Sequence, residues 1–194
     1  MIKAIVFDYF GVIIPDGPVQ SWLRKNTSSP EPAIQILKDL SLKWDLGETE
    51  YPEFNNILSK YTGIPVDQVF HTLFESIEIY KDTIELIKSL KKNYKIILLS
   101  NGPKENPHLM LKHQNIENLF DEIIISAEHK IMKPDPKIYE LMLSVGKIDA
   151  SQALFIDDRQ INVDSANSLG IKSLLFTDAL TLKKDLINIG IKLE

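Results

Sequence analysis

Asp8 is the first residue in this 194-residue chain whose position suggests chemistry. It directly follows Ala4-Ile5-Val6-Phe7, an apolar run that predicts a strand buried on both faces of a parallel sheet. Gly11 comes three positions after Asp8 and predicts a turn there. A carboxylate at the carboxyl end of such a strand lies at the edge where open α/β sheets bind their ligands. Phe10, between the acid and the glycine, is apolar and aromatic.

Further polar groups follow two other apolar runs. Ser100-Asn101-Gly102 offers a hydroxyl, an amide and a flexible backbone, which suit anionic oxygens at the start of a helix. Because parallel strands end at one edge of a sheet, we expect Asp8, Asp157 and Asp158 to form a carboxylate cluster. These acids repel one another unless a hard cation such as Mg²⁺ neutralises them. Two alternatives stay open: Ser100-Asn101-Gly102 as a plain turn, and Asp157-Asp158 as a helix N-cap.

Lys133 immediately precedes Pro134-Asp135-Pro136, a rigid entry into a predicted helix. From that position its ammonium group could hold a phosphate. The alternative is a solvated surface residue, which is the usual state of lysine.

The spacing of apolar residues predicts two kinds of organisation. From about residue 16 to residue 79 these residues recur at helical spacing, which indicates an all-helical insertion. From residue 80 onward, helical patterns alternate with short apolar runs typical of strands. Together with the first strand, they predict an α/β fold with a doubly wound, parallel, five-stranded sheet and right-handed crossovers.

Composition excludes several classes of function. The formal net charge is −5 and no basic stripe is present, which argues against a nucleic-acid partner. The absence of cysteine excludes disulfides, thiolate nucleophiles and cysteine metal sites. No apolar run approaches the ~18 residues of a membrane span, and the N-terminus lacks the pattern of a secretory signal. We therefore expect a soluble, cytoplasmic protein with no membrane partner; the oligomeric state is not predictable from these data.

Taken together, the motifs resemble those of the haloacid dehalogenase-like (HAD) hydrolase superfamily, and the resemblance covers the whole chain. The matching segments, in order along the predicted sheet edge, are Asp8, Ser100-Asn101-Gly102, Lys133-Pro134-Asp135-Pro136 and Phe155-Ile156-Asp157-Asp158. The last of these, followed by Arg159, looks especially like the phosphatase members. The resemblance implies a Rossmann-like catalytic core of residues 1–15 and 80–194 and a helical cap of the C1 type at residues 16–79.

The resemblance also implies a role for each motif residue. Asp8 would be the nucleophile, forming an aspartyl ester or phosphoaspartate that water then hydrolyses. Ser100 and Lys133 would hold the transferring group and the nucleophile, next to Asn101 and Gly102 in the substrate-binding loop. The ligands of Mg²⁺ would be Asp8, the backbone carbonyl of Phe10, Asp157 and Asp158. The implied substrate is a small phosphorylated metabolite.

Phe10 departs from the phosphatase pattern. Phosphatases that this chain resembles carry a second aspartate there, which protonates the leaving alkoxide and later activates water. General acid–base help is worth about 10²–10⁴-fold, so we expect an attenuated enzyme or one restricted to good leaving groups. The 2-haloacid dehalogenases resemble the chain at this position, because they carry an aromatic residue and release a halide that needs no proton. They work without metal, however, and differ around the fourth motif.

Three functions follow from the sequence in order of preference. The first is a Mg²⁺-dependent hydrolase of small phosphate esters, and the second is a metal-independent 2-haloacid dehalogenase. The dehalogenase needs a cationic cradle for halide, whereas the chain has two arginines, of which only Arg24 lies in the insertion. The third is a non-catalytic protein that keeps the fold and binds a phosphate ligand for regulation.

Overall fold

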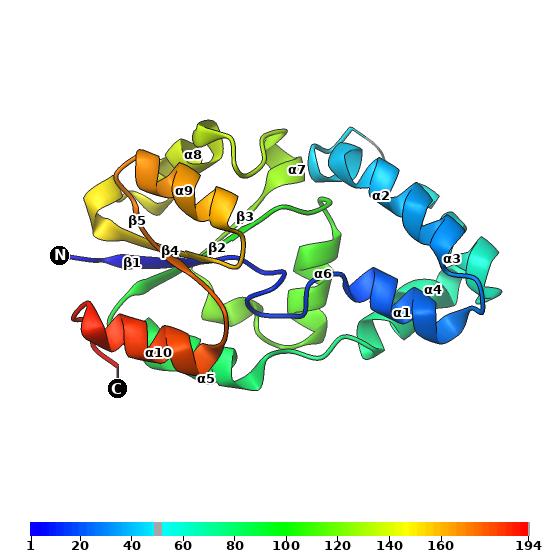
Figure 1. The fold of residues 1–194 in the computed structure, drawn as a ribbon, viewed down its shortest axis with the longest axis horizontal. Helices are drawn as coiled ribbons and strands as arrows, with labels where there is room; N and C mark the ends of the chain where they lie inside the picture. Colours follow the sequence, from blue (N-terminus) through cyan, green and yellow to red (C-terminus); the bar gives the residue numbers. More distant parts are fainter. Residues whose placement is uncertain (49–51, 194) are drawn as a thin grey trace.

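The computed structural model describes residues 1–48 and 52–193, so residues 49–51 of the predicted insertion lie outside the described part. A parallel five-stranded sheet in the order β3-β2-β1-β4-β5 forms the centre of the molecule (Figure 1). Its strands are β1 (Ala4–Phe7), β2 (Lys95–Ser100), β3 (Glu122–Ile125), β4 (Ala153–Asp157) and β5 (Lys172–Leu175). The order places β1 and β4 side by side where the chain reverses its direction across the sheet, which is where such folds bind ligands. The predicted doubly wound α/β fold is confirmed.

Helices cover both faces of the sheet, as Figure 1 shows. One face carries α8 and α9, whose apolar residues pack against the side chains of Val6, Leu99 and Phe155. The other carries α5, α6 and α10, which pack against Phe7 and Leu98. These helices are α5 (Lys81–Lys91), α6 (Asn106–His113), α8 (Pro136–Gly146), α9 (Gln160–Ser168) and α10 (Ala179–Asn188). Alternate residues of each strand therefore enter opposite cores, which explains the continuous apolar runs.

Four further helices lie beyond the carboxyl ends of the strands (Figure 1). They are α1 (Pro18–Asn26), α2 (Glu31–Asp45), α3 (Pro52–Thr62) and α4 (Val66–Glu75), and we call them the inserted helices. Their buried residues, such as Trp22, Leu58 and Leu73, are continuous with the core below β1. The inserted helices thus share an apolar interior with the sheet, and the strand ends lie between the two.

Two details differ from the sequence prediction. β5 is shorter than the predicted run 171–176 and Leu175 is 40% exposed, because β5 is the edge strand. A short helix, α7 (Ser126–His129), follows β3 directly, where we expected only the end of a strand. α7 is the part of the core that contacts the end of α2. Among the described residues, no helix combines the length and apolar character that crossing a membrane requires.

Candidate active site

The register of β1 and β4 brings the first and fourth motifs together. Phe7 lies opposite Ile156, and the Asp8 N–H donates to the Ile156 carbonyl oxygen at 2.9 Å. Asp8 and Asp157 therefore leave neighbouring strands at the same level, and both side chains are buried, with 6% and 0% exposed. The two carboxylates therefore lie together at the sheet edge, as the sequence predicted.

Lys133 lies between the two carboxylates. Its ammonium nitrogen is 2.8 Å from Asp8 Oδ1 and 2.7 Å from Asp157 Oδ2, and the residue is 2% exposed. The alternative of a solvated surface lysine is thus wrong. Asn101 holds the backbone of Lys133: its amide nitrogen donates to the Lys133 carbonyl at 2.9 Å, and its amide oxygen accepts the Lys133 N–H at 2.8 Å. The second motif therefore positions the lysine of the third.

Asp157 is the most firmly held of the acids. Its Oδ1 accepts the Arg159 N–H and the Asn162 amide, both at 2.9 Å, while Oδ2 accepts from Lys133. Burial alone would raise its pKa, but the charge and hydrogen bond of Lys133 and the hydrogen bond of the Arg159 N–H hold the pKa below its usual range. Burial raises the pKa of Asp8 to about 8, since Lys133 offsets only part of the cost and Asp157 adds repulsion.

The third acid, Asp158, completes a site of suitable chemistry for a metal ion. One carboxylate oxygen each of Asp8, Asp157 and Asp158 lies within 4.8 Å of the other two. When all three acids are ionised, their three negative charges face the single positive charge of Lys133, and one divalent cation would balance the surplus. Burial and the charge of Asp157 raise the pKa of Asp158. Oxygen ligands and excess negative charge fit Mg²⁺.

Gly11 allows Asp158 to approach the loop of the nucleophile. Its φ is +79°, and a Cβ atom on it would collide with the Asp158 carboxylate. A side chain at position 11 would therefore displace one of the three acids as well as strain the backbone.

A cavity of about 220 Å³ opens above the acids. Its wall consists of Asp8, Phe10, Asp16, Asp45, Asn101, Gly102, Pro103, Met132, Lys133, Asp158, Arg159 and Asn162. Of the predicted site residues, Ser100 and Asp157 are buried outside this wall, and the Ser100 hydroxyl donates to the Asn101 carbonyl at 3.1 Å. The remaining predicted residues all contribute to the wall.

Ser126 joins Gly102 of the second motif to the inserted helices. Its hydroxyl accepts the Gly102 N–H at 3.1 Å and donates to the carbonyl of Asp45, the last residue of α2, at 2.6 Å. Gly47 follows with φ +66°, and a Cβ atom there would come within 2.5 Å of the Ala127 carbonyl oxygen. The end of α2 is thus seated directly on α7.

Sequence reasoning missed Asp45. Asp45 lines the cavity together with Lys133 and Arg159, and burial raises its pKa to about 7, although these two cations lower it. The available signal was local: a carboxylate in the last turn of a helix faces the negative end of the helix dipole, where acids are disfavoured.

A second, apolar cavity of about 100 Å³ adjoins the first. Its wall consists of Phe10, Pro18, Val19, Trp44, Asp45, Phe54, Leu73, Phe74, Ile77, Pro103, Asn106 and Met110. Phe10, Asp45 and Pro103 line both cavities. Within the described part of the chain, two buried polar atoms in this wall lack a hydrogen-bond partner, Trp44 Nε1 and Asn106 Oδ1.

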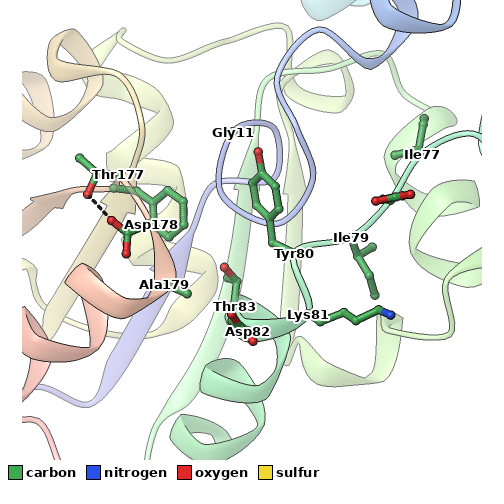
Figure 2. A pocket seen from close by; sticks show the side chains of 12 residues that line it. Gly11, Ile77, Ile79, Tyr80, Lys81, Asp82, Thr83, Thr177, Asp178 and Ala179 are labelled. Atoms are coloured by element: carbon green, nitrogen blue, oxygen red, sulfur yellow. Dashed lines mark hydrogen bonds between the residues drawn. The ribbon is translucent and has the colours of Figure 1, made fainter.

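A larger hollow, of about 980 Å³, lies elsewhere, beside the returning segment 77–83 (Figure 2). Tyr80 stands next to the Gly11 loop there, and Thr177 donates to Asp178 at 3.3 Å. The Asp178 carboxylate also caps α10 by accepting the Thr181 N–H at 2.8 Å. The wall of this hollow contains none of the predicted site residues.

The parallel sheet, the acid at the end of β1 and the lysine between two acids are the arrangement that the sequence motifs predicted. A sequence profile described as haloacid dehalogenase-like hydrolase matches residues 24–176, so the chain belongs to this family. The family prediction is confirmed.

Several known proteins resemble the chain along most of its length. A D-ribitol-5-phosphate phosphatase of Bacteroides thetaiotaomicron is 25% identical over 192 residues, covering 89% of this chain and 91% of that protein. A sesquiterpene phosphatase of Aspergillus oryzae is 25% identical over 182 residues, covering 92% and 91%. An (S)-2-haloacid dehalogenase of Burkholderia cepacia is 21% identical, covering 89% and 82%. The fold matches the crystal structure of a HAD family enzyme from B. thetaiotaomicron in complex with magnesium and inorganic phosphate, with TM-score 0.74 and 24% identity over 92% and 96% of the two chains.

Proposed function

We propose that this protein is a Mg²⁺-dependent hydrolase of small phosphate esters that uses Asp8 as its nucleophile. The observation that carries the proposal is the placement of Lys133, buried between Asp8 and Asp157, two acids that lie within 4.8 Å of a carboxylate oxygen of Asp158. This arrangement orients one acid and leaves a surplus of negative charge for a cation. The phosphatases among the relatives support a small phosphorylated metabolite as the substrate.

The chain's own residues suggest how the reaction would proceed. Lys133 and the Tyr9 N–H, which donates to Asp8 Oδ1 at 2.6 Å, hold the nucleophile through that oxygen. The other oxygen is then available to attack phosphorus and form an aspartyl phosphate. Asp157 keeps Lys133 charged and in place, and Asn101 positions it through its backbone.

Asp8, Asp158, Asp157 and the Phe10 carbonyl would hold Mg²⁺, which when bound would neutralise charge on the phosphate. Since the Gly102 N–H already donates to Ser126, we infer that Gly102 shapes the phosphate pocket by its lack of a side chain. We propose that Ser100 supports this loop, because its hydroxyl donates a hydrogen bond to the Asn101 carbonyl.

We also propose that residues 16–79 act as a cap on a core of residues 1–15 and 80–194. The seating of Asp45 and Gly47 on α7 supports this division, because it brings the inserted helices over the cavity from the side opposite the sheet. A closed cap would exclude water from the acids and strengthen their electrostatic interactions.

Phe10 leaves the loop of the nucleophile without a proton donor. Its ring lies in the wall of the apolar cavity together with Trp44, as expected of an aromatic residue packed against a cap. We therefore expect this loop by itself to support only leaving groups that depart without protonation, such as acyl and aryl phosphates.

A panel of phosphorylated metabolites and 2-haloacids, assayed with Mg²⁺ and with EDTA, tests the proposal. We expect phosphate release that requires Mg²⁺ and disappears in Asp8→Asn. Haloacid dehalogenation stays the second candidate because Phe10 is aromatic, as in the dehalogenases. Arg24 does not support it, because this arginine forms an exposed ion pair with Glu31. Halide release that persists in EDTA, without phosphate release, would establish the second candidate and reject the first.

A further inference from the structure

Asp45 lies in the wall of both cavities, at the boundary between them. The first cavity contains the nucleophile and the acids, and the second is apolar. A phosphate ester that places phosphorus in the first and its organic body in the second has its leaving oxygen at their boundary. We propose that Asp45 donates the proton to this leaving oxygen and that the leaving group is an apolar alcohol. This proposal rests on the proposed function. Asp45, in the inserted helices, thereby supplies the proton that Phe10, which has no acidic group, cannot supply.

Asp45 is held in place through its backbone, and its carboxyl group is left free. The Ser126 hydroxyl binds its carbonyl at 2.6 Å, and Gly47 permits the close contact with Ala127 that follows. Over residues 1–48 and 52–193, neither a hydrogen bond nor an ion pair engages the Asp45 carboxylate. A positioned acid without a structural partner is what proton transfer requires.

The surroundings of Asp45 favour a carboxyl group that can exchange a proton near neutrality. Burial raises its pKa to about 7, while Lys133 and Arg159 oppose the rise. The carboxylates of Asp8, Asp16 and Asp158 line the same cavity, and Glu128 and His129 belong to α7, on which the end of α2 rests. At neutral pH a substantial part of the population would therefore carry the proton.

The second cavity identifies the class of leaving group. Its wall is mostly aliphatic and aromatic, and its volume of about 100 Å³ limits the organic body to a short one. Trp44 Nε1 offers a buried donor and Asn106 Oδ1 a buried acceptor, and neither has a partner within the described residues. These two atoms would bind one polar group on an otherwise apolar body, because unpaired buried polar atoms are costly. An alcohol is a poor leaving group, which is why a proton donor is needed at the junction.

The two chemical steps balance. In the first, Asp8 attacks phosphorus, the bond from phosphorus to the leaving oxygen breaks, and that oxygen takes the proton of Asp45 and departs as the alcohol. In the second, water attacks the aspartyl phosphate, the Asp45 carboxylate takes a proton from the water, and the bond from phosphorus to Asp8 breaks. Phosphate leaves, and both acids return to their initial states.

The test compares Asp45→Asn with the wild-type protein on two substrates, n-butyl phosphate and p-nitrophenyl phosphate, with Mg²⁺. kcat/KM reports the first step, in which only the alkyl alcohol needs a proton. We expect kcat/KM to fall by about 10²–10⁴-fold for n-butyl phosphate and to change little for p-nitrophenyl phosphate. Asp16→Asn is the matched control, because it removes another carboxylate from the wall of the same cavity.

Two additions make the result decisive. Phe10→Asp in the Asp45→Asn background should restore much of the activity on n-butyl phosphate, since it returns a carboxyl group to the cavity. Unchanged melting curves and circular dichroism of Asp45→Asn should show that the variant is folded. In the wild type, n-butyl phosphate should also exceed glycerol phosphate in kcat/KM by about tenfold, because the second cavity is apolar.

Equal losses on n-butyl and p-nitrophenyl phosphate in folded Asp45→Asn, or no loss on either, would overturn the assignment of Asp45 while leaving the proposed function intact. A preference of the wild type for glycerol phosphate would overturn the apolar leaving group. Failure of the wild type on every phosphate ester with Mg²⁺ would instead reject the proposed function, and this inference with it.

Discussion

Replacing Lys133 with methionine tests the electrostatic design of the site. The substitution keeps a long, flexible side chain and removes the charge that lies 2.8 Å from Asp8 Oδ1 and 2.7 Å from Asp157 Oδ2. Both acids are almost fully buried, so in the absence of metal their charges would lose the ion-pair partner that they share. Removing one partner from a buried ion pair costs about 3–5 kcal/mol. In a chain of this size 1 kcal/mol corresponds to roughly 2–4 °C, so we expect the melting temperature to fall by roughly 6–20 °C in EDTA.

The assay is thermal unfolding in EDTA and in millimolar Mg²⁺. Burial alone would lower the pKa of Lys133, but Asp8 and Asp157 raise it above its usual range. A raised pKa in the folded state means that the stabilisation is fully present below the unfolded value and is lost only at strongly alkaline pH. The pKa of Asp8 is about 8 beside Lys133 and would rise further without it, so the loss should be larger at pH 9 than at pH 6. Mg²⁺ should recover part of the loss by mass action.

Lys137→Met is the matched control, because Lys137 is an exposed residue near the start of α8. The reasoning is refuted if Lys133→Met in EDTA loses no more stability than Lys137→Met. A second check is the double variant with Asp8→Asn, which should lose less than the sum of the two single variants. Strict additivity would show that Lys133 and Asp8 do not interact in the folded protein.

Four further outcomes are expected. Asp8→Asn should abolish turnover and trapping by beryllium fluoride without a loss of fold; retained activity would exclude Asp8 as the nucleophile. Mg²⁺ should raise the melting temperature, and calorimetry should show weaker binding in Asp158→Asn; no binding at millimolar Mg²⁺ would remove the metal from the proposal. Asp45→Asn should gain stability relative to the wild type as pH rises from about 4 to about 7, because a raised pKa in the folded state makes ionisation destabilising; a difference independent of pH would contradict that. Gly47→Ala should destabilise by about 1–3 kcal/mol at its φ of +66° and should broaden the arrangements of α2 against α7 in solution scattering; an unchanged melting temperature would count against the seating described.

The sequence by itself determined the sheet and the meeting of its motifs. Apolar runs of four to six residues can be buried on both faces only in a covered parallel sheet, and the polar residue that ends each run must then lie at one edge. Asp8 and Asp157 were predictable in this way, because both directly end buried strands. The departure of Phe10 from the phosphatase pattern was also visible in the sequence, because Phe10 lies only two residues after Asp8.

Only the tertiary structure decided how Lys133, Asn101 and Asp45 are used. Local patterns do not distinguish a surface lysine from a buried one, and the burial of Lys133 results from Asn101 and the two acids around it. Asp45 reaches the site because α2 is seated on α7 through Ser126 and Gly47. That contact joins segments distant in the chain and depends on side-chain packing between helices, which no periodicity in the sequence encodes.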